Sequence, residues 1–275
     1  MKAGDAGAKW PLLTLDAVTL RFGGLTAVNA FSTQVERGQL FGIIGPNGAG
    51  KTTAFNLITG VYTPSAGRVL FDGEVVSAGP QDGRRAFRSK PYELAGKGIC
   101  RTFQNIRLFG PLTVLENVRA AFQQRLSTGL FAATFRTPAF FDEESAVIAE
   151  ANELLALVEL GHLANSEARN LAYGEQRRLE IARALATKPR LLLLDEPAAG
   201  MNPSEKVRLS EMVKRIRERF GLTVLMIEHD MRFVMGLCER IAVLDHGEKI
   251  AEGTPAEVRA NPAVVEAYLG EAPAA

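Results

Sequence analysis

The chain has 275 residues, enough for one large α/β domain or for one domain with a subdomain. Its 32 Lys and Arg residues nearly balance 31 Asp and Glu residues, without a polybasic run, so a nucleic-acid surface is not expected. Cys100 and Cys238 have no metal-ligand spacing, residues 1–9 lack the apolar region of a secretory signal, and no apolar stretch approaches the roughly 20 residues of a membrane span. We expect a soluble cytosolic protein with reduced thiols, able to lie against a membrane protein.

Residues 12 to 73 predict strands joined by tight turns. Apolar and polar residues alternate there in short runs, for example at residues 13–17 and 69–71. Gly23-Gly24 and Asp72-Gly73 are turn signals between such runs. The pattern predicts a β-rich edge fused to a nucleotide-binding core.

A glycine-rich loop follows an apolar strand predicted at residues 39–44 and precedes a helix predicted at residues 54–58. In such a loop successive N–H groups point inward, and the helix N-terminus adds the positive end of its dipole. Lys51 is then placed to reach the β- and γ-phosphates, and the Thr52 hydroxyl to ligate Mg²⁺. The alternative is a glycine-rich turn without a ligand, but the complete motif between a strand and a helix predicts nucleoside triphosphate binding. The residues that fit the pattern G-x-x-x-x-G-K-[ST], with the threonine that follows it, are Gly45, Pro46, Asn47, Gly48, Ala49, Gly50, Lys51, Thr52 and Thr53.

Helical patterns follow from residue 113 onward. Thr113 and Glu116 have the spacing of a capping box, and a second helix is predicted from residue 143 to about residue 159, with one apolar face. Between these helices, residues 126–141 form an aromatic-rich connection. Its four phenylalanines (131, 135, 140 and 141) either pack the helical region or form part of a docking face for a membrane partner.

Strands and helices alternate again from residue 190, which predicts a mainly parallel sheet. Two short helices are predicted in the tail, where a proline stands at each first helical position. The predicted strands are 191–194, 222–227 and 240–244, and the predicted helices are 203–220, 255–259 and 262–269.

Two acids follow the buried strand of four leucines at residues 191–194. Asp195 is placed to hold Mg²⁺ as a Walker-B acid, and Glu196 to polarise a water for in-line attack on a γ-phosphate. An acidic strand end that faces solvent is the alternative. The phosphate loop earlier in the chain favours the catalytic interpretation.

A third motif makes the chain resemble a known family. Residues 171–178 read Leu-Ala-Tyr-Gly-Glu-Gln-Arg-Arg, lead into a predicted helix, and place Gly174 21 positions before Asp195. The order and spacing of the three motifs resemble those of the ATP-binding-cassette (ABC) family, whose signature L-S-G-G-Q lies about twenty residues before the Walker-B acids. The resemblance implies an α/β fold with a P-loop NTPase core and mainly parallel sheet, an antiparallel β subdomain and an inserted α-helical subdomain.

The resemblance covers nearly the whole chain and implies a single ABC ATPase domain over residues 12–270. Its implied parts are a β subdomain with the phosphate-loop core (12–104), a helical subdomain (105–170), the signature helix with the α/β core (171–253) and a C-terminal helical tail (254–270).

Four further positions match the family one by one. Gln104 resembles the Q-loop glutamine, which is implied to contact Mg²⁺ or the attacking water and to lie at the transmembrane interface. His229, after the predicted strand at residues 222–227, resembles the switch histidine that contacts the γ-phosphate. Phe22 stands where the family has an aromatic that stacks on adenine, with core packing as the alternative. Gly174 is implied to face the triphosphate held by a second cassette.

The signature departs from the family pattern. Ala172 replaces the serine, Tyr173 the first glycine and Glu175 the glutamine, and Asn202 stands where the family usually has an aspartate. In the family, the serine hydroxyl donates to the γ-phosphate of the ATP held by the opposite subunit. Its loss is expected to weaken binding across the dimer by roughly 1.5–3 kcal/mol. The phosphate loop, the Walker-B pair and the histidine are complete.

These departures resemble one branch of the family, the ATP-binding subunits of bacterial importers of branched-chain or hydrophobic amino acids. The long stretch between Gln104 and the signature resembles the larger of the two ATPase subunits in such importers. The segments that carry the branch resemblance are 173–183, 196–203, 227–231, 253–255, 261–262 and 267–270.

The branch resemblance implies ATP hydrolysis, with ATP and Mg²⁺ as cofactors, coupled to transport through ATP-driven closure of a cassette dimer. The implied partners are two multi-pass membrane permease subunits, a second ABC ATPase subunit in a hetero- or homodimer and, indirectly, a periplasmic substrate-binding protein, with no nucleic acid. The implied location is peripheral, on the cytoplasmic face of the bacterial inner membrane. Open alternatives are another cargo (urea, a short amide or an export substrate), a soluble non-transport ABC ATPase, and a regulatory subunit with little turnover.

Overall fold

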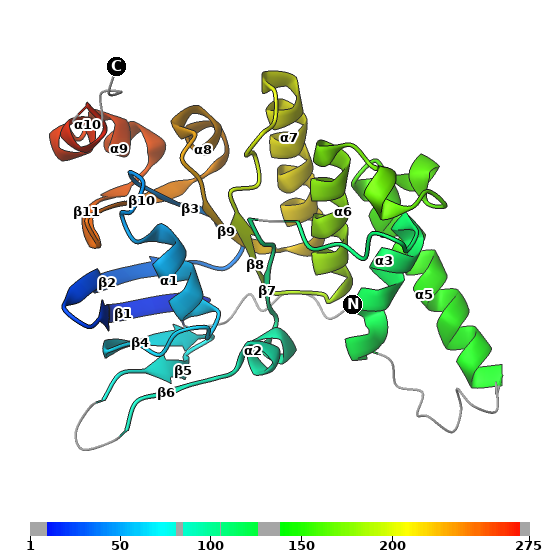
Figure 1. Cartoon of the computed structure of the whole chain (residues 1–275), viewed down its shortest axis with the longest axis horizontal. Coiled ribbons are helices and arrows are strands. Elements are labelled where there is room, and N and C mark those ends of the chain that lie inside the picture. Colours follow the sequence, from blue (N-terminus) through cyan, green and yellow to red (C-terminus); the bar gives the residue numbers. More distant parts are fainter. Residues whose placement is uncertain (1–9, 81–84, 105, 126–137, 270–275) are drawn as a thin grey trace. The chain divides into compact units, whose positions relative to one another are not determined.

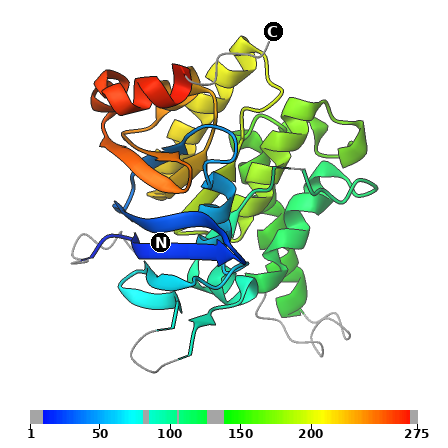
Figure 2. The same ribbon diagram turned by 60° about the vertical axis from the view of Figure 1, so that its left-hand side comes forward.

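The computed structural model describes residues 10–80, 85–104, 106–125 and 138–269. The chain divides into two compact units, one formed by residues 1–101 and 190–275 and the other by residues 102–189. Figures 1 and 2 show the described helices and strands of both units. Among the described residues, no helix is both long and apolar enough to cross a bilayer.

The first unit contains an antiparallel sheet, with the described strands in the order β2-β1-β4-β5-β6. The Asp72-Gly73 turn joins β4 to β5 with positive φ angles of 54° and 77°, as its sequence predicts. Alternate side chains of β1 and β2, such as Leu13, Phe31 and Val35, are buried in the core. The strands are β1 (Leu13–Phe22), β2 (Leu25–Val35), β4 (Ala66–Phe71), β5 (Glu74–Ala78) and β6 (Phe87–Arg88).

A second sheet in the same unit has the order β11-β10-β3-β9-β8-β7, and every neighbouring pair except β10 and β11 is parallel. The mainly parallel core predicted from the alternating pattern is therefore confirmed. All residues of β3, β8 and β9 are buried, as expected for strands covered on both faces. The strands are β3 (Leu40–Ile44), β7 (Ile99–Arg101), β8 (Leu191–Asp195), β9 (Thr223–Ile227), β10 (Arg240–Asp245) and β11 (Glu248–Gly253).

The helices of the first unit connect these strands and cover the sheet. α8 packs against β3 and α7, while α9 and α10 pack against β11. Proline begins α7, α9 and α10, and Asn202 and Thr254 cap the first two through their side chains. The helices are α1 (Lys51–Ile58), α2 (Pro91–Lys97), α7 (Pro203–Phe220), α8 (Met231–Leu237), α9 (Pro255–Ala260) and α10 (Pro262–Leu269).

The second unit is helical in its described part. α3 begins after Thr113, whose side chain accepts from the Glu116 N–H, so the predicted capping box is confirmed. α3 packs against both α5 and α6. The elements are α3 (Val114–Ala121), α5 (Pro138–Leu157), α6 (Tyr173–Ala186) and the 3₁₀ turns η1 (Phe122–Arg125), η2 (Gly161–Leu163) and η3 (Ala168–Asn170).

Several bounds differ from the sequence analysis. The loop helix starts at Lys51 rather than residue 54, and α5 starts at Pro138 rather than residue 143. The second compact unit covers residues 102–189, whereas the helical subdomain is expected over residues 105–170. The unit extends further because α6 packs on α3 and α5. The predicted aromatic connection lies largely outside the described residues, and so do its phenylalanines 131 and 135.

Candidate functional site

Three of the predicted motifs meet at one edge of the parallel sheet. The strands β3, β9 and β8 are direct neighbours, with Ile43 paired to Ile227 and Ile227 paired to Asp195. The phosphate loop follows β3, the acids end β8, and His229 follows β9. Because the carboxyl ends of parallel strands lie at the same edge, this topology brings together residues up to about 180 positions apart.

The loop between β3 and α1 needs glycine at its tight positions. Gly45, Gly48 and Gly50 have φ angles of 152°, 81° and 96°, in the region that other residues rarely adopt. A Cβ atom would lie 2.0 Å from the Leu244 carbonyl oxygen at Gly45, and 2.5 Å from the Ala27 carbonyl oxygen at Gly50. The loop backbone is therefore pressed against neighbouring strands, and α1 starts directly after it with the N–H groups of its first turn.

Lys51 folds back over this loop. Its ammonium donates to the carbonyl oxygens of Gly45 at 2.5 Å and Pro46 at 2.7 Å, and only 7% of the residue is exposed. Asn47 and Gly48, between those carbonyls and the helix, are exposed. A positive charge thus lies at the mouth of a glycine loop that ends in a helix N-terminus, which is a combination suited to a phosphate chain.

Asp195 is held by a buried ion pair. Arg101, at the end of β7, donates from Nη2 to Asp195 Oδ2 at 2.6 Å, and the two side chains are 10% and 5% exposed. The same guanidinium donates to Asn56 Oδ1 at 2.7 Å and lies 5.5 Å from the centre of the Phe55 ring, both on α1. The Walker-B acid and the phosphate-loop helix are therefore tied together by one arginine.

Glu196 and His229 face each other across the edge. His229 Nδ1 lies 3.9 Å from Glu196 Oε1, and the side chains are 58% and 20% exposed. Glu196 has a φ angle of 46°, a strained conformation for a residue with a Cβ atom. Such strain is often found where a side chain must point in one functional direction, here from the strand end toward the histidine.

Glu228 joins the two loops that carry these residues. Its side chain is 1% exposed, and its oxygens accept the Ala198 N–H at 2.7 Å and the His229 N–H at 3.2 Å. Burial raises the pKa of the Glu228 carboxyl, although these hydrogen bonds act in the opposite direction. The residue fixes the segment after Glu196 to the segment that carries His229.

Asn202 has a local structural task. Its side-chain oxygen accepts the Glu205 N–H at 3.0 Å, and the Glu205 carboxylate accepts the Asn202 N–H at 2.9 Å. This reciprocal capping box begins α7. An amide performs this task as well as the aspartate usual in the family, since Asn and Asp are about equal as N-caps.

Phe22 is the exposed aromatic that the sequence analysis identified. It is 45% exposed at the end of β1 and meets the Tyr62 ring edge-to-face, with ring centres 5.2 Å apart at 78°. Core packing therefore does not explain it. An exposed ring held by a second ring can stack on a planar base.

Gln104 and Gly174 lie in the second unit. Gln104 is exposed, and Gly174 is the second residue of α6, which begins at Tyr173. Ala172 precedes the helix, and the Glu175 carboxylate accepts the Ala172 N–H at 2.9 Å. Glu175, which replaces the signature glutamine, thus caps the start of this helix.

The donor set of the first unit fits Mg²⁺. Thr52 offers a hydroxyl in the first turn of α1, and Asp195 offers a carboxylate at the end of β8. These are hard oxygen ligands, and Mg²⁺ takes only one or two carboxylates from a protein when substrate phosphates supply the rest. The described residues contain no cluster of three or more His, Cys, Asp or Glu arranged to hold a metal alone.

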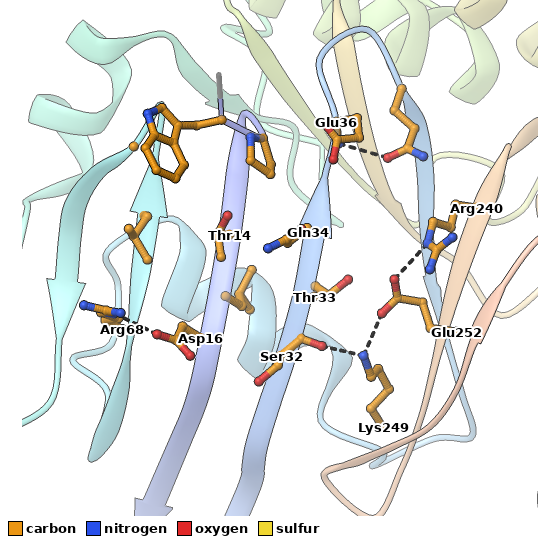
Figure 3. A pocket seen from close by; sticks show the side chains of 16 residues that line it. Thr14, Asp16, Ser32, Thr33, Gln34, Glu36, Arg68, Arg240, Lys249 and Glu252 are labelled. Carbon is orange, nitrogen blue, oxygen red and sulfur yellow. Dashed lines mark hydrogen bonds and ion pairs between the residues drawn. The ribbon is translucent and has the colours of Figure 1, made fainter. Parts of the chain in front are cut away.

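A separate hollow of about 840 Å³ lies across β1, β2, β4 and β11 of the first unit and contains no residue of the phosphate loop. Figure 3 shows ion pairs in its wall: Arg68 with Asp16, and both Arg240 and Lys249 with Glu252. The hollow is lined by none of the predicted nucleotide-binding residues, so the nucleotide chemistry belongs to the sheet edge.

Sequence reasoning missed Arg101, Glu228 and Tyr62. Arg101 and Glu228 act through partners 94 and 30 positions away, and no local pattern reveals such pairs. Only the neighbouring motifs could have drawn attention to them, since Glu228 directly precedes His229 and Arg101 lies three residues before Gln104.

Comparison with known proteins gives matches to two family models. Residues 28–199 match the model described as ABC transporter, and residues 248–274 match one described as branched-chain amino acid ATP-binding cassette transporter. The chain is 46% identical over 262 residues to BraF of Pseudomonas aeruginosa, named as a high-affinity branched-chain amino acid transport ATP-binding protein, covering 95% of this chain and 99% of BraF. LivG of Escherichia coli K12, which carries the same description, is 45% identical over equal shares.

A solved structure agrees with the fold. MJ1267, an ATP-binding cassette of an ABC transporter in its ADP conformation, matches with a TM-score of 0.79 and 32% identity, covering 94% of this chain and 99% of MJ1267. The α/β cassette fold expected from the motifs is confirmed.

Proposed function

Since the chain belongs to the ABC transporter family of ATP-binding subunits, we propose that it hydrolyses ATP to power an importer of branched-chain or other hydrophobic amino acids. The observation that carries the ATPase part is the convergence of the phosphate loop, Asp195-Glu196 and His229 on one sheet edge. The cargo is inferred from the two relatives named for branched-chain amino acid transport and from the matching C-terminal model.

Each predicted site residue has a proposed task. The backbone of residues 45–53 and Lys51 hold the triphosphate, and Phe22 stacks on the adenine. Glu196 polarises the attacking water, and His229, 3.9 Å from it, contacts the γ-phosphate. Thr52 and Asp195 would hold Mg²⁺, which would neutralise charge on the phosphate oxygens, and Gln104 is the further residue that the family resemblance implies as a ligand.

The proposed catalytic unit is a dimer of cassettes, because a single phosphate loop leaves one side of its nucleotide open. The first turn of α6, including Gly174, would face the triphosphate of a second ABC ATPase subunit, with its free N–H groups and positive dipole end. Closure then depends on the γ-phosphate, and its hydrolysis releases the two halves.

The second unit has a surface suited to membrane partners. Phe103, which directly precedes Gln104, is 40% exposed. Phe109 and Leu112, which follow it, are 50% and 37% exposed. Arg107 and Arg183 lie over the two phenylalanine rings, at 4.7 and 4.9 Å from their centres. Exposed apolar side chains of this kind favour a protein contact. We assign it to cytoplasmic loops of two multi-pass permease subunits, at the cytoplasmic face of the bacterial inner membrane.

The alternatives differ in cargo or in class. Urea, a short amide or an export substrate would use the same ATPase, because the cargo does not touch this subunit. A soluble non-transport ABC ATPase is a different class, whereas BraF and LivG, which match 95% of this chain over 99% of their own length, are both named as transport ATP-binding proteins. A regulatory subunit with little turnover would not need the strained Glu196 opposite His229.

Purification of the complex from its native membrane tests the proposal. We expect two permease subunits and a second ATPase to copurify, and the reconstituted vesicles to take up leucine when ATP, the periplasmic binding protein and leucine are supplied. Uptake of urea or an amide with no leucine uptake would overturn the cargo. Isolation as a lone homodimer with ribosomes or DNA would overturn the class.

A further inference from the structure

One face of α6 carries charged and polar side chains that the proposed chemistry does not use. Tyr173, Arg177 and Glu180 follow one another at spacings of four and three residues, so they lie on the same side of the helix. Arg177 is 0% exposed and Glu180 is 6% exposed, which is unusual for ionisable residues. Buried charges persist only where hydrogen bonds satisfy them, so their partners reveal what this face holds.

The partners are backbone groups of Phe103 and Gln104. Arg177 Nη1 donates to the Phe103 carbonyl oxygen at 2.6 Å, and Nη2 donates to the Gln104 carbonyl oxygen at 2.8 Å. Glu180 accepts the Phe103 N–H at 2.9 Å through Oε1 and binds Arg177 Nη1 at 2.9 Å through Oε2. Two oppositely charged side chains therefore surround one short piece of backbone and are bonded to each other.

Tyr173 completes the network. Its phenol oxygen accepts from Arg177 Nη2 at 3.1 Å. Each terminal nitrogen of the guanidinium carries two N–H groups, and each now has two acceptors. A lysine could not reproduce this planar set of four donors. The tyrosine is thus built into the buried network, although 46% of its own surface is exposed.

We propose that Tyr173, Arg177 and Glu180 form a latch that fixes the backbone of Gln104 to the signature helix, with Tyr173 as a positioning residue. The tyrosine at the place of the signature's first glycine then has a task of its own. The latch rests on the proposed function only in the role given to Gln104 at the nucleotide. Within that function, Gln104 and the first turn of α6 move as one body when the nucleotide state changes.

Hydrogen exchange of the full-length chain measures the latch without reference to activity. Tyr173→Phe removes one acceptor and leaves a buried N–H of Arg177 unpaired, so the Phe103 amide should exchange about three- to tenfold faster. Glu180→Gln keeps an acceptor oxygen but removes the charge, and should accelerate the same amide at least as much. Tyr92→Phe, which removes the hydroxyl of a 66% exposed tyrosine in α2, should leave it unchanged.

A kinetic measurement then separates positioning from simple stabilisation. Tyr173→Phe should lower kcat for ATP hydrolysis severalfold while the ATP Kd stays within about twofold of the original. Unchanged exchange at Phe103 in both variants overturns the latch, and so does a general acceleration over α3 and α5 that is no greater at Phe103. Failure of the proposed function is a separate result, because absence of ATP turnover in the unaltered chain would leave the exchange comparison intact.

Discussion

The ion pair between Arg101 and Asp195 makes a quantitative prediction about stability. Its atoms are 2.6 Å apart, and the side chains are 10% and 5% exposed. Arg101→Met keeps most of the apolar volume but removes the cation that lies 2.6 Å from the buried Asp195 carboxylate. Removal of one partner from a buried pair typically costs about 3–5 kcal/mol, so we expect the free energy of unfolding to fall by that amount.

Thermal and urea unfolding of the full chain provide the assay. At about 2–4 °C per kcal/mol for a chain near this size, the transition should move down by roughly 6–20 °C. The matched control is Arg169→Met, because Arg169 forms an ion pair with Glu167 in which the side chains are 62% and 40% exposed. Such a surface pair is worth less than about 1 kcal/mol.

A double-mutant cycle identifies the cause. Asp195→Asn in the Arg101→Met background removes the carboxylate charge that Arg101 no longer neutralises, so the double variant should be more stable than Arg101→Met alone. The reasoning fails if Arg101→Met costs no more than Arg169→Met. It also fails if Asp195→Asn gives no relief, because the loss would then come from packing on Phe55 rather than from an orphaned charge.

Three further predictions concern Glu196, Phe22 and Glu228. Glu196→Gln should reduce ATP turnover about 10²–10⁴-fold with ATP binding retained, whereas a regulatory subunit would show no change in a phosphate-release assay. Phe22→Ala should weaken ATP binding about fivefold, for the loss of roughly 1 kcal/mol of stacking, while inorganic triphosphate binding stays constant in calorimetry. Burial raises the pKa of Glu228 above its ordinary value of 4.5, so the native carboxyl retains a proton that the unfolded chain has lost, and this contribution to stability decreases as the pH rises through the raised pKa. Glu228→Gln does not titrate and should flatten that decrease in urea unfolding measured at several pH values; an unaltered pH profile would contradict the assignment.

The elements found from the sequence are those with strong local signals. α7 and α10 match their predicted bounds of 203–220 and 262–269, because proline at the first helical position marks where each begins. β3 and β8 were evident as short apolar runs next to a glycine loop and a pair of acids.

The elements missed lack such signals or had signals that were overlooked. β11 reads Glu-Lys-Ile-Ala-Glu-Gly, an edge strand with charged positions and little alternation, and its pairing with β10 decides its conformation. α8 does have a cap, since the Asp230 side chain accepts the N–H groups of Arg232 and Phe233. That aspartate could have predicted the helix.

The candidate site likewise contains residues that the sequence reveals and residues that only the fold reveals. Motif residues such as Lys51 and Asp195 are recognisable because their chemistry needs fixed spacing along the chain. Arg101 and the network around Arg177 join backbone or side chains more than 70 positions apart, and only the fold brings them together. The departures at Tyr173 and Glu175 looked like losses in the sequence, but in the structure each side chain makes a hydrogen bond of its own.

Nucleotide affinity of the Lys51→Ala variant tests the central claim most directly. The account predicts that equilibrium binding of ATP falls by about two orders of magnitude or more, because a buried ammonium at the mouth of the loop is lost, with Lys97→Ala as a control that removes a lysine paired to Glu74 outside the site. Equal ATP affinity in Lys51→Ala and in the unaltered chain would contradict it.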